Sequence, residues 1–251
     1  RRSFLILAFL LSQGAMACAA ELGFSRHYSS NMVLQREKPV LIRGSADKGA
    51  EITVSFLGQT EKTKADGNGQ WSVSLDPMPA SSKGAEMVAE SAGKRARLGD
   101  VLVGDVFLFA RQTTIDVSLG RDETGKRAAA DLPSVRVMMI KTIPAVDPQQ
   151  DLAEEATSGW ATLNKNTALT MNAAAFYLAR GLSQDAGVPV GIIDLNMGHH
   201  FPIAWMSKEA LLNTTKIYDA KQTTVEGSIK AVDNIFKMME DAQAAFEEAG
   251  R

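Results

Sequence analysis

The sequence contains few of the residues that build redox or metal sites. Cysteine occurs once among 251 residues, as Cys18, and histidine occurs three times. A single thiol cannot form a disulfide within the chain, and the pair His199 and His200 lacks the nearby cysteine, third histidine or H-x-x-E-H pattern that zinc sites use. A glycine-rich phosphate loop is also lacking, because Gly187 and Gly191 do not fit G-x-G-x-x-G. We therefore expect no metal and no cofactor.

An excess of one charge and a membrane-spanning apolar run are absent as well. The chain carries 27 basic and 29 acidic residues, for a formal net charge of −2. This balance, without any block of like charge, argues against a nucleic-acid partner. The apolar run near the N-terminus is too short to cross a bilayer, so we expect no membrane span. Hydrophobic residues make up 45% of the sequence, which is typical of a globular chain with one large domain or two small ones.

Residues 1–20 have the pattern of a secretory signal peptide. Two arginines are followed by an apolar stretch over 3–11 and by small residues over 15–20, where cleavage is expected. The apolar stretch shows no helical periodicity, which argues against a buried N-terminal helix. A lipidated Cys18 is a second alternative, although residues 15–17 match a lipobox poorly. The pattern predicts a secreted or periplasmic protein.

Residues 21–100 have the pattern of a β-sandwich-like domain. Apolar and polar residues alternate over 52–56 and over 71–75, which is the period of a half-buried strand. The sequence DGNG at 66–69 predicts a hairpin turn, because glycine and asparagine accept positive φ. Short strands with frequent turns are typical of a small sandwich. Trp71 could stack on a sugar, but its place in the apolar phase of its strand favours a core position.

From residue 101 the pattern changes to that of an α/β domain, which we predict to span 101–251. The apolar runs over 101–109 and 134–140 indicate strands buried on both faces. A helix with one apolar face over 171–182 is followed by another buried strand over 188–195. Strands and helices in this order, with short connections, predict a parallel sheet flanked by helices.

The α/β domain is expected to end in a long helix over 223–249. Its apolar residues recur at spacings of four and three, as in a coiled-coil seam: Val225, Ile229, Val232, Phe236 and Met239. The seam covers barely two heptads before Gln243 interrupts it. Packing on the same chain is the favoured interpretation and a dimer helix is the alternative, so the oligomeric state stays open.

Five short segments, spread along the chain, form a recognisable set of motifs. They are SNMVLQR at 30–36, KPV at 38–40, LVGDVFL at 102–108, VPVGII at 188–193 and AWMS at 204–207. Together they resemble the sialate O-acetylesterase family, which are carbohydrate esterases with an SGNH-type hydrolase domain. The resemblance implies a β-domain followed by a partial SGNH-type three-layer α/β hydrolase domain. It also implies the deacetylation of sugars as the ancestral activity.

The first catalytic block of that family reads GQSNM, with serine as the nucleophile, and corresponds here to RQTTI at 111–115. Thr113 falls on the serine. A threonine hydroxyl can act as a nucleophile, but its extra methyl stiffens χ1 and crowds the path of attack. Arg111 falls on the glycine, where a positive φ in a tight turn would strain an arginine. The resemblance thus assigns the nucleophile position to Thr113 and predicts weak catalysis there.

The second block reads WGGT in the family and MGHH at 197–200 here. Gly198 falls on the first glycine, so the resemblance makes its backbone N–H a donor to the oxyanion. His199 adds bulk where the family has glycine. The family's later W-Y-Q-G-E-x-N block and D-x-x-H motif have no match between Ile203 and Arg251. We therefore expect a divergent and truncated copy of the family's domain.

Other residues are weaker candidates for the site. The pair His199 and His200 could serve as general base to the nucleophile, although an exposed loop pair is favoured. Asp194 and Asp116 follow strands and could be catalytic carboxylates, but aspartates at strand ends more often cap the next turn. Trp205 matches a family position and either lines the pocket or packs inside the fold.

These observations predict the scaffold of a sialate O-acetylesterase-like carbohydrate esterase, which hydrolyses esters of O-acetylated sugars. Because Thr113 replaces the serine, the activity of this chain is expected to be weak or absent. The alternative is a non-catalytic pseudoenzyme that binds a glycan or a protein partner. In either case an O-acetylated carbohydrate or another glycan is the expected ligand.

Overall fold

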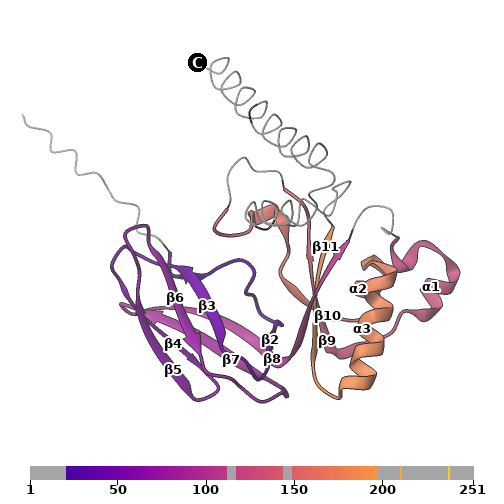
Figure 1. Cartoon of the computed structure of the whole chain (residues 1–251), viewed down its shortest axis with the longest axis horizontal. Helices are drawn as coiled ribbons and strands as arrows, with labels where there is room; N and C mark the ends of the chain where they lie inside the picture. Colours follow the sequence, from indigo (N-terminus) through magenta and orange to yellow (C-terminus); the bar gives the residue numbers. More distant parts are fainter. Residues whose placement is uncertain (1–20, 112–116, 144–148, 197–209, 211–236, 238–251) are drawn as a thin grey trace, which may run out of the picture.

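The computed structural model describes residues 21–111, 117–143, 149–196, 210 and 237 (Figure 1). The predicted signal peptide over 1–20 lies outside these residues, and so does the predicted helix over 223–249 apart from Lys237. The described strands form a three-stranded sheet of order β1-β3-β6 and an eight-stranded sheet of order β10-β9-β11-β8-β7-β4-β5, with β2 paired to β8.

The N-terminal part is built from both sheets. Its strands are β1 (Gly23–Phe24), β2 (Val33–Gln35), β3 (Val40–Ser45), β4 (Glu51–Phe56), β5 (Gln59–Lys64), β6 (Gln70–Leu75), β7 (Ser81–Ser91) and the first half of β8 (Lys94–Arg111). Burial alternates along β4 and β6, which confirms the half-buried strands predicted there. Buried side chains from the two sheets join in one core. Trp71 is 3% exposed and meets Phe24 edge to face, as a core tryptophan should.

Strand β8 belongs to both parts of the molecule. Its first half pairs antiparallel with β7, and from Asp105 to Arg111 it pairs in parallel with β11. Strand β8 keeps β7 as a partner up to Val103 and takes β11 from Asp105, while Asp100, with a positive φ of 53°, lies where the β7–β8 register shifts. The boundary predicted between residues 100 and 101 therefore lies inside a continuous strand. The change of strand partner comes after that boundary, between Val103 and Asp105.

The C-terminal part is a mixed α/β assembly. Its elements are α1 (Glu123–Ala128), β9 (Leu132–Ile140), β10 (Trp160–Leu163), α2 (Lys165–Thr170), α3 (Ala173–Ala186) and β11 (Val190–Asn196). Strand β11 is parallel to both β8 and β9, which confirms the predicted parallel pairing, and β10 adds an antiparallel edge. Helices α1 to α3 lie on one side of these strands (Figure 1). The full three-layer SGNH arrangement stays a prediction.

Helix α3 shows why the sequence folds locally as predicted. Asn172 caps its N-terminus, accepting from the backbone N–H groups of Ala174 and Ala175. Gly187 ends it in the left-handed conformation, with φ of 63°. Phe176 is fully buried and brings the helix onto the second core cluster, which includes residues of β9 and β11. No helix within the described ranges is long and apolar enough to cross a membrane.

The second half of β8 corrects one expectation. The run over 101–109 was predicted to be buried on both faces, but Phe107 is 36% exposed and Leu108 is 58% exposed. In the described part of the chain this half of β8 has β11 on one edge and no strand on the other beyond Gly104, where β2 ends its pairing. An apolar strand at the edge of a sheet leaves side chains accessible that a central strand would bury.

Two of the segments that carry the family resemblance contact each other. Arg36 binds the Asp105 carboxylate through Nε at 2.9 Å and through Nη2 at 3.2 Å. Gln35 donates to the same carboxylate at 3.3 Å and accepts from the backbone N–H of Val106 at 3.0 Å. The hydrogen bond from Arg36 lowers the pKa of the Asp105 carboxyl below its ordinary range. These motifs therefore join β2 to the strand that leads into the parallel sheet.

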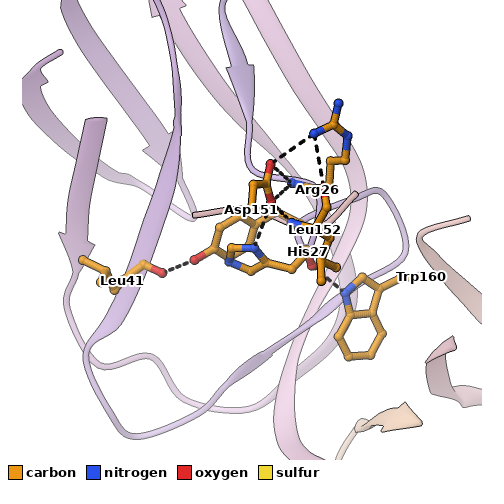
Figure 2. A network of polar contacts seen from close by, with 7 residues as sticks. Arg26, His27, Leu41, Asp151, Leu152 and Trp160 are labelled. Atoms are coloured by element: carbon orange, nitrogen blue, oxygen red, sulfur yellow. Dashed lines mark hydrogen bonds and ion pairs between the residues drawn. The ribbon is translucent and has the colours of Figure 1, made fainter. Parts of the chain in front are cut away.

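A second junction ties the N-terminal loop to the segment before β10 (Figure 2). The Asp151 carboxylate accepts from the backbone N–H of Arg26 at 2.9 and 3.0 Å and lies 3.7 Å from Nδ1 of His27. Trp160 donates its indole N–H to the carbonyl of His27 at 3.0 Å. The Tyr28 hydroxyl donates to the carbonyl of Leu41 at 2.6 Å, and burial raises the pKa of Tyr28 to about 12. The loop is thus held by both halves of the chain.

His27 should make this junction sensitive to acid. Burial lowers the pKa of His27 below its ordinary value of 6.5, and the Asp151 carboxylate opposes that shift only in part, while Arg43 adds to it. The unfolded chain then binds the proton more readily, so stability is full above 6.5 and is lost as the pH falls below it. Urea unfolding at about pH 7.5 and about pH 5.5 should show a larger loss for the natural chain than for His27→Gln. Equal losses in the two proteins would contradict the prediction.

Candidate functional site

A cavity of about 700 Å³ lies where three parallel strands end. Arg111 is the last residue of β8, Ile140 of β9 and Asn196 of β11, and all three line it. The opposite wall is the segment over 154–158, which includes a short 3₁₀ helix (Glu154–Ala156). The carboxyl ends of parallel strands are where open α/β sheets bind their ligands. The position and size of the cavity make it the candidate site.

A buried ion pair forms the inner wall of the cavity. Arg111 donates from Nε to Oδ1 of Asp194 at 2.8 Å and from Nη2 to Oδ2 at 3.4 Å. The Arg111 side chain is 11% exposed and that of Asp194 is 1% exposed. This forked geometry matches the guanidinium to the carboxylate and compensates a charge that burial would otherwise penalise. Two of the three strands that end at the site, β8 and β11, are therefore joined by side chains as well as by their ladder.

The structure gives Asp194 a partner that neither sequence-based hypothesis for this residue predicted. As a catalytic carboxylate it would need to face the reacting groups, and as a turn cap it would accept from backbone N–H groups after β11. Both of its oxygens instead accept from Arg111. From the sequence, Arg111 was notable only because it replaces a glycine of the family, at a position where a positive φ would strain an arginine. The structure gives it an observable role as the partner of a buried carboxylate.

The other wall of the cavity is fixed by contacts around the end of β9. The Thr142 hydroxyl donates to the carbonyl of Asn196, which joins the ends of β9 and β11. The backbone N–H of Lys141 donates to the carbonyl of Ala156 at 2.8 Å and attaches the 3₁₀ segment. Ala156 itself is buried. Sequence reasoning did not identify these residues, because they match no motif and meet only through strand register.

The remaining predicted site residues lie outside the described part of the chain. They are the nucleophile position Thr113, the oxyanion donor Gly198, the base candidates His199 and His200, and Asp116 and Trp205. In the sequence, Thr113 comes two residues after Arg111 and Gly198 comes two residues after Asn196. Each position therefore lies two residues beyond the end of a strand whose last residue lines the cavity.

The described residues offer no clear metal site. They contain no group of three or more histidine, cysteine, aspartate or glutamate side chains placed to hold one ion. The cavity lining does include Glu154 and Glu155 besides Asp194. The Asp194 oxygens accept from Arg111. The acidic residues of the lining can therefore offer a ligand hydrogen-bond acceptors and negative charge.

Comparisons with known proteins identify the relatives of this chain. No protein-family model matches it. It is 24% identical to a sialate O-acetylesterase from Mus musculus over 227 residues, which cover 83% of this chain and 42% of that protein. It is 27% identical to a sialate O-acetylesterase from Homo sapiens over 206 residues, which cover 75% of this chain and 39% of that protein. The chain thus spans about two fifths of the length of the curated relatives it matches.

A solved structure agrees with the sequence matches. A carbohydrate acetylesterase from Xanthomonas citri superposes with a TM-score of 0.70 at 29% identity, over 77% of this chain and 44% of that structure. The chain is therefore a mixed α/β protein, mostly of strands, built like a carbohydrate acetylesterase. By sequence it is a divergent relative of the sialate O-acetylesterases.

Proposed function

We propose that this chain is an O-acetylesterase scaffold that takes O-acetylated carbohydrate into the cavity at the ends of β8, β9 and β11, with weak or absent hydrolysis. The observation that carries the proposal is the cavity at the carboxyl edge of the parallel strands, in a chain whose structural neighbour is a carbohydrate acetylesterase. Thr113 and Gly198 each lie two residues beyond the end of one of those strands. The signal-like residues 1–20 support a secreted or periplasmic location.

The ion pair supports the weak-activity part of the proposal. The family resemblance implies a glycine at position 111, two residues before the nucleophile, and this chain has Arg111 there. Its guanidinium is held against Asp194 in the wall of the cavity. A large, ion-paired side chain next to the turn alters the space where a serine nucleophile would be presented. Thr113 adds its own crowding methyl group, so the proposal is a ligand-binding scaffold with little turnover.

Hydrolysis of an aryl acetate by the purified chain tests this function. We expect a rate close to that of buffer, and Thr113→Ser should raise it little, because Arg111 and Asp194 remain in place. Thr60→Ala, on the distant strand β5, is the matched control for Thr113→Ala. Turnover well above buffer that disappears in Thr113→Ala and survives in Thr60→Ala would show an active enzyme. If no O-acetylated sugar bound to the chain, the binding part of the proposal would be wrong.

A further inference from the structure

The charges around the cavity bear on which acetylated sugar it accepts. Among the described lining residues two are cationic and three are anionic: Arg111, Lys141, Glu154, Glu155 and Asp194. The described wall therefore carries one more negative charge than positive. Sialic acids and uronic acids bring a carboxylate of their own, whereas neutral acetylated sugars do not.

The buried cation of the wall is committed to its own partner. A guanidinium is the best-suited protein group for binding a carboxylate, because its donors match the two oxygens. In Arg111 the Nε and Nη2 donors already face Asp194, whose side chain is 1% exposed. A ligand carboxylate that displaced Asp194 from the Nε and Nη2 donors would leave the Asp194 charge buried without compensation, which is strongly unfavourable.

The other charges of the described lining do not compensate for this loss. Lys141 is exposed at the end of β9 and is outnumbered by Glu154 and Glu155, which are exposed on the facing segment. Like charges brought together oppose binding, most strongly at low ionic strength. Neutral groups make up the rest of the described lining, with hydroxyls and an amide from Thr142, Thr157, Ser158 and Asn196 and apolar surface from Met139, Ile140 and Ala156. Such a mixture suits sugar hydroxyls and an acetyl methyl group.

We propose that the cavity selects neutral O-acetylated sugars and disfavours those that carry a carboxylate. This inference rests on the proposed function and adds the substrate class. It separates this chain from what the names of its sialate-directed relatives suggest. The Arg111–Asp194 pair contributes to this selectivity by engaging the buried cation of the described wall.

Two ligands that differ only in the carboxylate test the proposal. An O-acetylated glucuronic acid and its methyl ester are titrated against the full chain by calorimetry at low salt. We expect the methyl ester to bind at least about tenfold more tightly, since the acid meets like charge and finds its cation engaged. The double variant Glu154→Gln with Glu155→Gln should narrow that ratio, whereas Glu51→Gln, an exposed glutamate on β4, should leave it unchanged.

The outcomes separate this inference from the function on which it rests. A smaller preference for the ester, or a preference for the free acid, overturns the selectivity while leaving carbohydrate binding in place. Binding of neither ligand, nor of an O-acetylated glucoside or sialic acid, overturns the proposed function and the selectivity together. A tenfold ratio that the glutamate variants leave untouched overturns the assignment of the selectivity to the charges of the described lining.

Discussion

Arg111→Ala is expected to lower the free energy of unfolding by about 3–5 kcal/mol, the range seen when one partner of a buried ion pair is removed. The cause is Asp194, whose side chain is 1% exposed and would keep its charge without a compensating guanidinium. Strands β8 and β11 meet at this pair, so the loss should also loosen the wall of the site. Urea unfolding followed by circular dichroism at neutral pH measures the change.

A matched arginine shows whether burial causes the effect. Arg97 pairs with Glu86 at 3.0 Å, but their side chains are 51% and 49% exposed. Arg97→Ala should therefore cost only about 0–1 kcal/mol. Arg111→Met combined with Asp194→Leu should recover most of the loss, because apolar residues of similar size often replace a buried pair without penalty. If Arg111→Ala cost no more than Arg97→Ala, the Asp194 carboxylate would not depend on its partner.

The fold was most predictable where a local pattern determines the outcome. The period-two alternation over 52–56 and 71–75 corresponds to β4 and β6, because each has one face on the core. The apolar run over 188–195 corresponds to β11, a strand with partners on both edges. Helix α3 was predicted from the apolar residues over 171–182 and the glycine that ends it, but its buried residues are Ala175, Phe176 and Ala179, and Leu178 is 40% exposed. In the three strands burial, backbone preference and sequence period all agree.

The exposure of the second half of β8 could not be predicted in the same way. The run over 101–109 is as apolar as a central strand, yet Leu108 is 58% exposed. Hydrophobicity shows that a strand is stable in a sheet, but strand order decides whether it has one neighbour or two. The same reason hid the continuity of β8 through Asp100. A single strand can change partners without any change that a local window would mark as an end.

The candidate site depends even more on distant pairing. Arg111 and Asp194 meet because β8 and β11 are parallel and in a register that places Asp194 opposite Phe109. No motif links the two residues, and a shift of one residue in that register would turn their side chains to opposite faces of the sheet. The residues with recognisable motifs, Thr113 and Gly198, were assigned by resemblance and lie outside the described part of the chain. The motifs therefore predicted at which edge of the sheet the site lies. The register between β8 and β11 determines which charged side chains meet there.

Gly104→Ala is expected to destabilise the protein by about 3 kcal/mol or more, at the upper end of what overpacking costs. A Cβ at this position would lie 2.0 Å from the carbonyl oxygen of Pro189 and 2.7 Å from its carbonyl carbon. These are backbone atoms, so no side-chain rotation relieves the overlap. The same carbonyl accepts the backbone N–H of Asp105 at 2.9 Å, and this contact begins the pairing of β8 with β11. Separating the strands here would loosen the ladder that positions Arg111 and Asp194.

Gly99→Ala is the matched control, since Gly99 lies on the same strand and a Cβ there would come no closer than 3.9 Å to Ser30. Thermal and urea unfolding of the two variants should therefore differ by most of the predicted loss. Gly104→Ala should also weaken binding in the cavity, although Gly104 does not line it, because the register of β8 against β11 carries the site. If both variants unfolded alike, the close approach of Pro189 to β8 would not hold the two strands together. We therefore predict that Gly104, in the LVGDVFL segment at 102–108, is needed for the packing of β8 against β11. Through that packing it maintains the geometry of the cavity.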